Sequence, residues 1–140
     1  MANQSQLEQG RAAYAYQCAE DANKQLGKKA KEYKSYVKKM PMLIKTNGLG
    51  AAVAFALSKG SKDGKINPKD GWGLIYNQIT IYLLDVSPNK LFTFQKNDLA
   101  KTLTTINSFE YRATTIDILA FLSWLRRFAD GLIEGEGGTE

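Results

Sequence analysis

The residues best suited to chemistry in this sequence are lysines, and they are concentrated in one early segment. Between Lys24 and Lys45 there are eight lysines and a single acid, Glu32. The whole 140-residue chain has a formal net charge of +5, so this segment holds more than the entire positive excess. Charges gathered in one segment attract a polyanion more strongly than a diffuse excess does, because their fields add. The cluster therefore predicts a surface that binds phosphates.

Helical spacing predicts that most of these lysines share one face. Apolar residues recur at 30, 33, 37 and 40, the period of a helix from about residue 28 to 40. At 100° per residue, the lysines at 28, 31, 34 and 38 lie opposite that apolar side. Lys24 and Lys45 join them only if the helix continues through Gly27 and Pro41, which are a plausible break and a predicted end, kink or new start. With the neighbours of this face included, the predicted phosphate contacts are Lys28, Lys31, Lys34, Lys38, Lys39, Lys45 and Lys59.

The alternative interpretation of the lysine face is an ordinary solvated surface. Such faces are usually balanced by acids one turn away, which form ion pairs within the helix. One acid among eight lysines cannot supply those pairs, so binding is favoured. Arg112, Arg126 and Arg127 are further candidates for anion or subunit contacts, against the alternative of a polar helix face with Arg126 near Asp130.

The residues that are absent exclude most kinds of catalytic site. There is no histidine, so a Ser-His-Asp triad, a Cys-His dyad and a histidine-ligated metal are excluded. A zinc site needs several Cys or His ligands, and Cys18 is the one such residue. Glu110 and Asp117 share a helix face but are separated by about 10 Å of rise, which is too far to hold one metal. We therefore predict no catalytic residue, no metal and no cofactor.

The glycines at the end of the lysine segment predict a tight junction instead of a nucleotide loop. The run Asn47-Gly48-Leu49-Gly50 begins like a dinucleotide-binding motif, but Val53 occupies the place of its third glycine. No Gly-Lys-Ser/Thr follows either. We interpret the run as the start of a helix that packs closely against a neighbour, with Thr46 or Asn47 as its N-cap.

These features must be positioned by helices, and the sequence predicts an all-α single domain of about five to six helices. The periodic segments run at about 4–23, 28–40, 49–59, 71–85 and 97–105, with a last helix capped at Asn107 or Ser108 and ending near 132. Gly60 is expected to end the third helix, and Asp70 to cap the fourth. A strand at 79–82 is the alternative there, because β-branched residues dominate those positions.

The predicted domain covers residues 1–133, and the Gly/Glu-rich residues 134–140 are predicted to form a flexible tail. No run of about 18 apolar residues predicts a membrane span. The first residues lack the pattern of a signal peptide, and Cys18 has no partner for an internal disulfide. A cytoplasmic location and no membrane partner are expected.

Two segments together resemble a known family. The first is residues 36–50, continuing through Ala54-Phe55 to Ser58-Lys59-Gly60; the second is residues 111–117, followed by 122–130. In this order on a short helical chain they resemble the small subunit of the type III-B CRISPR-associated Cmr complex, although that family often has Glu where Asp117 stands.

The resemblance implies an all-α subunit without catalytic activity or a small-molecule substrate. It implies that copies stack in a short filament against the crRNA-carrying backbone subunits and the large subunit, and help to line the groove for guide and target RNA. Lys38, Lys39 and Lys45 would be RNA contacts, and Arg126 and Arg127 would contact RNA or subunits.

Three other functions are left open by the residues. The first is a protein-interaction scaffold whose lysines meet acidic partner surfaces without contacting RNA. The second, a small metal-dependent nuclease, is disfavoured by the scattered carboxylates. The third, a helix-turn-helix DNA-binding protein, is disfavoured because the last helix is too apolar to be an exposed recognition helix.

Overall fold

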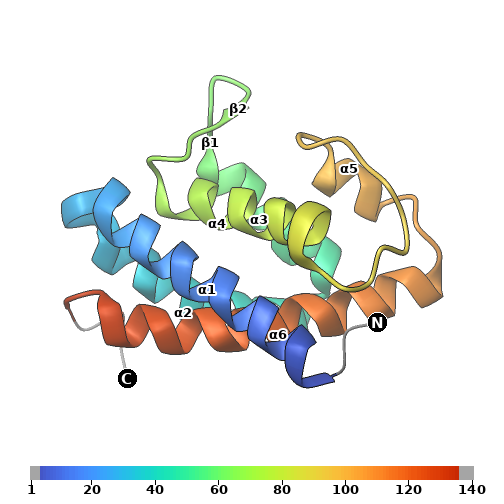
Figure 1. Cartoon of the computed structure of the whole chain (residues 1–140). Coiled ribbons are helices and arrows are strands. Elements are labelled where there is room, and N and C mark those ends of the chain that lie inside the picture. The colour runs from blue at the N-terminus through green and yellow to red at the C-terminus, as the bar shows by residue number, and fades with distance from the viewer. Residues whose placement is uncertain (1–3, 136–140) are drawn as a thin grey trace.

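A computed structural model describes residues 4–135, and helices dominate that part of the chain (Figure 1). The helices are α1 (Gln4–Leu26), α2 (Ala30–Asn47), α3 (Leu49–Gly60), α4 (Gly71–Ile81), α5 (Leu99–Leu103) and α6 (Ser108–Leu132). The shorter elements are a 3-10 turn (Gly27–Lys29), the strands β1 (Ser61–Lys62) and β2 (Lys65–Ile66), and a π-helical turn (Tyr82–Val86). The predicted all-α, single-domain fold is confirmed.

Helix α2 lies at the centre of this arrangement and contacts α1, α3, α4 and α6. Its predicted apolar side is buried, and the stripe extends beyond Met40 to Ile44. This burial explains why α2 continues through Pro41, which the sequence left as an end, a kink or a new start. A proline inside a helix costs about 3 kcal/mol. The burial of Met40 before Pro41 and of Ile44 after it offsets that cost.

Helices α1 and α6 share the most extensive contact between any two helices and run parallel, whereas α2 runs antiparallel to α6 (Figure 1). Two contacts show the parallel direction of α1 and α6. The ring of Tyr14 stacks on that of Phe121, and Asn23 donates a hydrogen bond to the carbonyl of Leu132 further along both helices. Because α2 is antiparallel to α6, the start of α2 lies beside the end of α6. This pairing sets which charged side chains meet.

Two glycines with positive φ separate α2 from its neighbours. Gly27 has φ +55° and lies in the 3-10 turn after α1, so the predicted break at this residue is confirmed. Gly48 has φ +92° and forms the junction of α2 and α3. The predicted N-caps Thr46 and Asn47 are wrong, because both residues are still within α2 and Gly48 takes the cap position.

The junction after Gly48 is closed by a side chain from α6. The hydroxyl of Tyr111 accepts a hydrogen bond of 2.7 Å from the backbone N–H of Gly50, one of the donors left unpaired at the start of α3. A Cβ at Gly50 would lie 3.3 Å from the same hydroxyl. The interpretation of this run as a helix start with close packing is confirmed.

Helices α3 and α4 contact each other at Gly60 and Gly73, which have no side chains. A Cβ built on Gly60 would lie 2.2 Å from the backbone nitrogen of Gly73. Gly60 is the last residue of α3, so its predicted place at the end of the third helix is confirmed, although its φ is not positive. It also allows backbone contact between the two helices.

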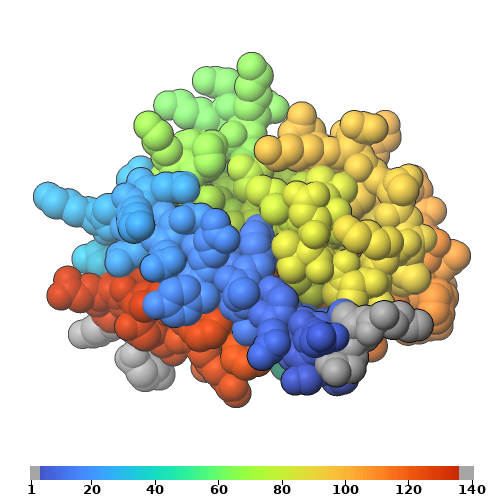
Figure 2. Space-filling view, viewed as in Figure 1, coloured from blue at the N-terminus to red at the C-terminus, as the bar shows by residue number. Residues whose placement is uncertain are grey.

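The segment between α3 and α4, which lies between two predicted helices, contains the β1–β2 hairpin. Asp63 and Gly64 both have positive φ, as a two-residue hairpin turn with right-handed strand twist requires. The hairpin projects from the body of the molecule (Figure 2). In the strand register Lys62 is paired with Lys65.

The predicted caps of the later helices are confirmed. The Asp70 carboxylate accepts from the backbone N–H of Trp72 and of Gly73 at the start of α4. At the start of α6, Asn107 and Glu110 form a reciprocal capping box. The alternative strand at 79–82 is wrong, because α4 runs to Ile81 and continues directly into the π-helical turn.

No helix within residues 4–135 is both long and apolar enough to cross a membrane. Residues 136–140 of the predicted tail lie outside the described residues. Gly135 lies inside them, and its carbonyl accepts a hydrogen bond from Lys34.

Candidate nucleic-acid interface

The predicted lysine face is divided in the structure. Lys34, Lys38 and Lys45 lie on the flank of α2 that meets α6, as their contacts with that helix and the residue after it show. Lys39 instead lies over the ring of Tyr36. Lys28 is in the 3-10 turn, outside α2. The prediction of a single row of lysines opposite the core is therefore wrong, because these lysines lie in different surroundings.

Lys34 is buried, with 6% of its surface exposed. Its Nζ donates hydrogen bonds to the carbonyl of Ile133 at 2.9 Å and to that of Gly135 at 2.8 Å. These carbonyls follow α6, where the helix dipole leaves partial negative charge, so the ammonium group caps this helix end. The prediction that Lys34 lies on the exposed face is wrong, and its charge is unavailable to a phosphate.

One turn further along α2, Lys38 forms an ion pair with Asp130 of α6 at 3.1 Å. The side chain of Lys38 is 25% exposed, so the pair lies at the surface, where such pairs contribute little stability. The alternative interpretation paired Arg126 with Asp130 within α6. Asp130 pairs across to α2 instead, and Arg126 has no ion pair within the described residues.

Beyond this pair, a groove of about 390 Å³ lies at the surface between α2 and α6. It is lined by Pro41, Lys45, Leu119, Ser123, Arg126, Arg127 and Asp130. We call it the α2–α6 groove. The cations Lys45, Arg126 and Arg127 are exposed, and in the part of the chain that the structure describes none is within 4.0 Å of a carboxylate.

The α2–α6 groove has the composition of a phosphate site. Its one acid is already paired with Lys38, so the local charge is positive. An arginine guanidinium presents parallel N–H donors that match two phosphate oxygens, and a lysine adds a point charge. The two segments that carry the resemblance meet here, because Lys45 comes from the first and both arginines come from the second.

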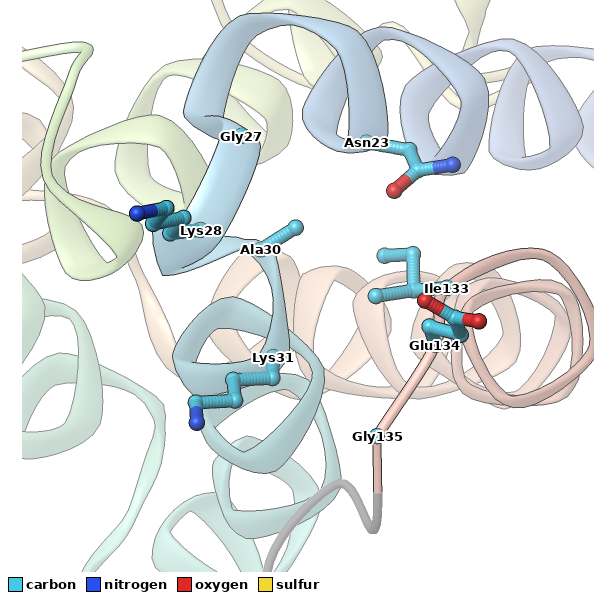
Figure 3. Close-up of a pocket in the computed structure, with 8 residues that line it drawn as sticks. All are labelled: Asn23, Gly27, Lys28, Ala30, Lys31, Ile133, Glu134 and Gly135. Carbon is cyan, nitrogen blue, oxygen red and sulfur yellow. The ribbon is translucent and has the colours of Figure 1, made fainter.

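Lys28 and Lys31 lie at a second hollow of about 400 Å³, between the 3-10 turn and the residues after α6. Asn23 and Ile133 line the side of the hollow that is away from Lys28 (Figure 3). Figure 3 shows both lysine side chains directed away from Glu134, the acid on its rim. Both lysines are exposed and stay predicted phosphate contacts.

Three other predicted cations lie elsewhere. Lys39 is 5.9 Å from the centroid of Tyr36, and Lys59 is 5.8 Å from that of Phe55, both on the side of α2 that faces α3 and α4. Arg112 is exposed beside a hollow at the start of α6. The structure therefore brings Lys45 together with Arg126 and Arg127, and separates Lys39, Lys59 and Arg112 from them.

Sequence reasoning missed a buried cation, Arg11 of α1. Its Nε donates to the hydroxyl of Tyr82 at 2.8 Å, and its Nη2 lies 3.2 Å from Oδ1 of Asp117. Glu8 completes the set with an ion pair at Nη1. The sequence spacing indicated that Arg11 is buried, because it lies four residues after Leu7 and three before Tyr14, on the apolar side of α1.

Asp117 is the centre of this buried network. It accepts hydrogen bonds from the hydroxyls of Tyr82 and Ser87, as well as from Arg11. A carboxylate used in this way is structural. Within residues 4–135, no group of three or more His, Cys, Asp or Glu gathers closely enough to hold a metal.

Burial and hydrogen bonding shift the titration of several of these groups. Donation from the Trp124 indole N–H, together with the charge and hydrogen bond of Arg11, holds the pKa of Glu8 below its ordinary value. Burial raises the pKa of Tyr82. Cys18 is buried, and burial raises the pKa of its thiol to about 12, so the thiol stays protonated near neutral pH.

Comparison with known proteins identifies the family to which this fold belongs. Residues 7–132 match the family described as CRISPR-associated protein (Cas_Cmr5). The fold is similar to the crystal structure of a CRISPR-associated Cmr5 family protein from Thermus thermophilus, with a TM-score of 0.68 and 27% sequence identity. That match covers 91% of this chain and 97% of the other. The chain therefore belongs to the Cmr5 family of CRISPR-associated proteins.

Proposed function

We propose that this chain is a non-catalytic small subunit of a type III-B Cmr complex, an RNA-guided system of antiviral defence. In this proposal it stacks with copies of itself against the backbone and large subunits in the cytoplasm, and lines the groove for crRNA and target RNA. The α2–α6 groove is its main contact with an RNA backbone. The observation that carries this assignment is the meeting of Lys45, Arg126 and Arg127 without carboxylate partners among the described residues.

Phosphate binding is the chemistry that best fits these cations. Each phosphate contact releases counterions, which adds affinity without reading sequence. A subunit that follows a guide of variable sequence needs this kind of contact. Lys31 at the start of α2 and Lys28 in the preceding 3-10 turn would add phosphate contacts at the second hollow, while Lys34 is excluded by its burial.

A salt titration of the full chain on a single-stranded RNA oligonucleotide tests the groove. Reversing two groove cations, with Lys45→Glu and Arg126→Glu, should weaken binding. It should also lower the log–log salt slope by about 1.4, since a single-strand contact contributes about 0.7. The matched control is Lys96→Glu with Lys101→Glu, two exposed lysines outside the groove with the same change in net charge. Equal effects of the two pairs would mean that net charge, and not the groove, determines binding.

The second candidate function is a protein-interaction scaffold without RNA contact. It is supported by two exposed apolar side chains one turn from groove residues, Met42 on α2 and Ile116 on α6, each 70% exposed. A protein partner that covered both side chains would remove their apolar surface from water.

The groove charge reversal separates the two functions, because both of them include contacts with other Cmr subunits. In a scaffold, the reversal should abolish co-purification with those subunits without changing RNA affinity, and Met42→Asp with Ile116→Asp should also prevent co-purification. If RNA affinity and its salt slope depend on the groove cations, the scaffold alternative fails.

A further inference from the structure

Three aromatic rings from three helices form a continuous row on the other flank of α2. Tyr36 of α2 stacks on Trp72 of α4 with ring centroids 4.6 Å apart and planes at 12°. Phe55 of α3 meets the same tryptophan at 5.1 Å and 89°. We call these three residues the aromatic row. A Cβ at Gly71 would lie 2.8 Å from the Tyr36 ring, so this glycine lets Tyr36 lie against the start of α4.

Burial differs sharply along the aromatic row. Trp72 is 6% exposed, whereas Phe55 is 38% exposed and Tyr36 is half-buried. The buried tryptophan therefore holds the rings of Tyr36 and Phe55 in place from the protein interior. Each of these two rings presents part of its surface to solvent. Rigid aromatic surface offered in this way is a platform on which another planar group can stack.

A lysine lies over each outer ring of the row. Nζ of Lys39 is 5.9 Å from the centroid of Tyr36, and Nζ of Lys59 is 5.8 Å from that of Phe55. Within residues 4–135, neither ammonium group is within 4.0 Å of a carboxylate. A cation–π contact at an exposed site is weak, so a phosphate could draw either lysine away from its ring.

The hairpin adds further positive charge next to Lys59. Strand β1 begins two residues after this lysine, and Lys62 is paired directly with Lys65 across the strands. Like charges in opposite positions destabilise a hairpin. An anion bound between them would remove that repulsion, and the hairpin projects outward where a ligand can reach it (Figure 2).

We propose that the aromatic row is a stacking site for a nucleobase of single-stranded RNA, with Lys39, Lys59 and the hairpin lysines contacting the flanking phosphates. The proposal rests on the proposed function for its ligand, RNA, but places a base where the α2–α6 groove takes only backbone. Every base has a flat π-face, so such a site tolerates any guide or target sequence. A single-stranded nucleic acid supplies both partners that this surface needs, a planar group for the rings and phosphates for the lysines.

Fluorescence of Trp72 tests this site directly. The chain has two tryptophans, so Trp124→Phe leaves Trp72 as the single reporter. The probes are a uridine octamer and an octamer of the same length and phosphate number that lacks bases. We expect the uridine octamer to quench Trp72 and to bind about tenfold more tightly than the abasic one, since stacking adds to each base held.

Phe55→Leu should bring the affinity ratio of the two octamers close to one while retaining salt-dependent binding. The matched control is Phe109→Leu, which removes an exposed ring from α6 and should leave the ratio unchanged. Thermal melts of both variants verify that they are folded.

Three outcomes would overturn the proposal. Equal affinities of the unchanged protein for the two octamers, with the salt slope retained, would exclude the stacking site and leave the proposed function standing. Equal effects of Phe55→Leu and Phe109→Leu would show that the row is not the site. Absence of salt-dependent binding to either octamer would contradict both this inference and the proposed function.

Discussion

Lys34 and Lys45 lie on the same flank of α2, three helical turns apart, and their surroundings give them opposite roles. Lys34 is covered by the end of α6 and donates to two backbone carbonyls. Lys45 lines the α2–α6 groove with two arginines and is exposed. Arg11 repeats the first pattern in the core, where its guanidinium bonds to Tyr82 and Asp117.

The difference shows that cations clustered in the sequence can have different roles, some in stability and others in ligand binding. A buried cation already donates its hydrogen bonds to protein acceptors and is shielded from ligands, so removing it should cost stability and leave ligand binding unchanged. An exposed cation without a carboxylate partner should behave in the opposite way. Each of the following substitutions tests whether this division is correct.

The largest effect is expected from breaking the buried network. Asp117→Ala should lower the free energy of unfolding by about 3 kcal/mol, because Arg11 and two hydroxyls lose their shared acceptor. Urea denaturation measures this loss. The folded variant should keep its RNA salt slope. A loss under about 1 kcal/mol would show that the network contributes little to stability.

Lys34→Met should lower the free energy of unfolding by about 2 kcal/mol. The substitution keeps an apolar chain of similar length but leaves the carbonyls of Ile133 and Gly135 without their charged donor. Urea denaturation and the salt titration are performed on the same sample. If the salt slope falls as it does for a groove variant, the division between buried and exposed cations is wrong.

A pH titration of stability should show the contribution of Glu8. Its pKa is lowered from an ordinary value of 4.5, so the folded state favours the ionised carboxylate. The resulting stabilisation is fully present above pH 4.5 and is lost as the pH falls through the lowered pKa. Glu8→Gln should remove this part of the acid dependence, measured by thermal melts between about pH 3 and 6.

The control for that titration is Glu20→Gln, an exposed acid on the same helix. It should leave the pH profile of the melting temperature unchanged. A similar flattening in both variants would assign the effect to net charge and not to the bonds of Glu8 with Trp124 and Arg11.

The smallest effect on stability is expected at the groove. Lys45→Ala should change the free energy of unfolding by less than about 0.5 kcal/mol, as is usual for exposed residues. It should nevertheless lower the RNA salt slope by about 0.7, the share of one single-strand phosphate contact. Lys101→Ala serves as the exposed control and should change neither quantity.

Much of the fold could be predicted because its signals are local. The apolar period of α2 and the caps at Asp70 and Asn107 depend on residues within a few positions of one another. Pro41 and Gly48 were harder, because tertiary packing carries α2 through the proline and the junction at Gly48 is closed by Tyr111 from α6.

The candidate site depends on distant contacts, and sequence spacing could not supply them. Lys34 lies 99 positions before Ile133, and nothing near it in sequence marks it as buried. The meeting of Lys45 with Arg126 follows only from the antiparallel pairing of α2 and α6. The aromatic row joins rings from three helices and has no signature in any one of them.

The continuity of α2 through Pro41 has a consequence for avidity. Tyr36 of the aromatic row and Lys45 of the groove lie on opposite flanks of this one helix, so their separation is fixed by the helix diameter of about 10 Å and by about 14 Å of rise between them. A strand captured on one flank would present its next nucleotides to the other at a high effective concentration. The two contacts together would then bind the strand more tightly than either contact alone.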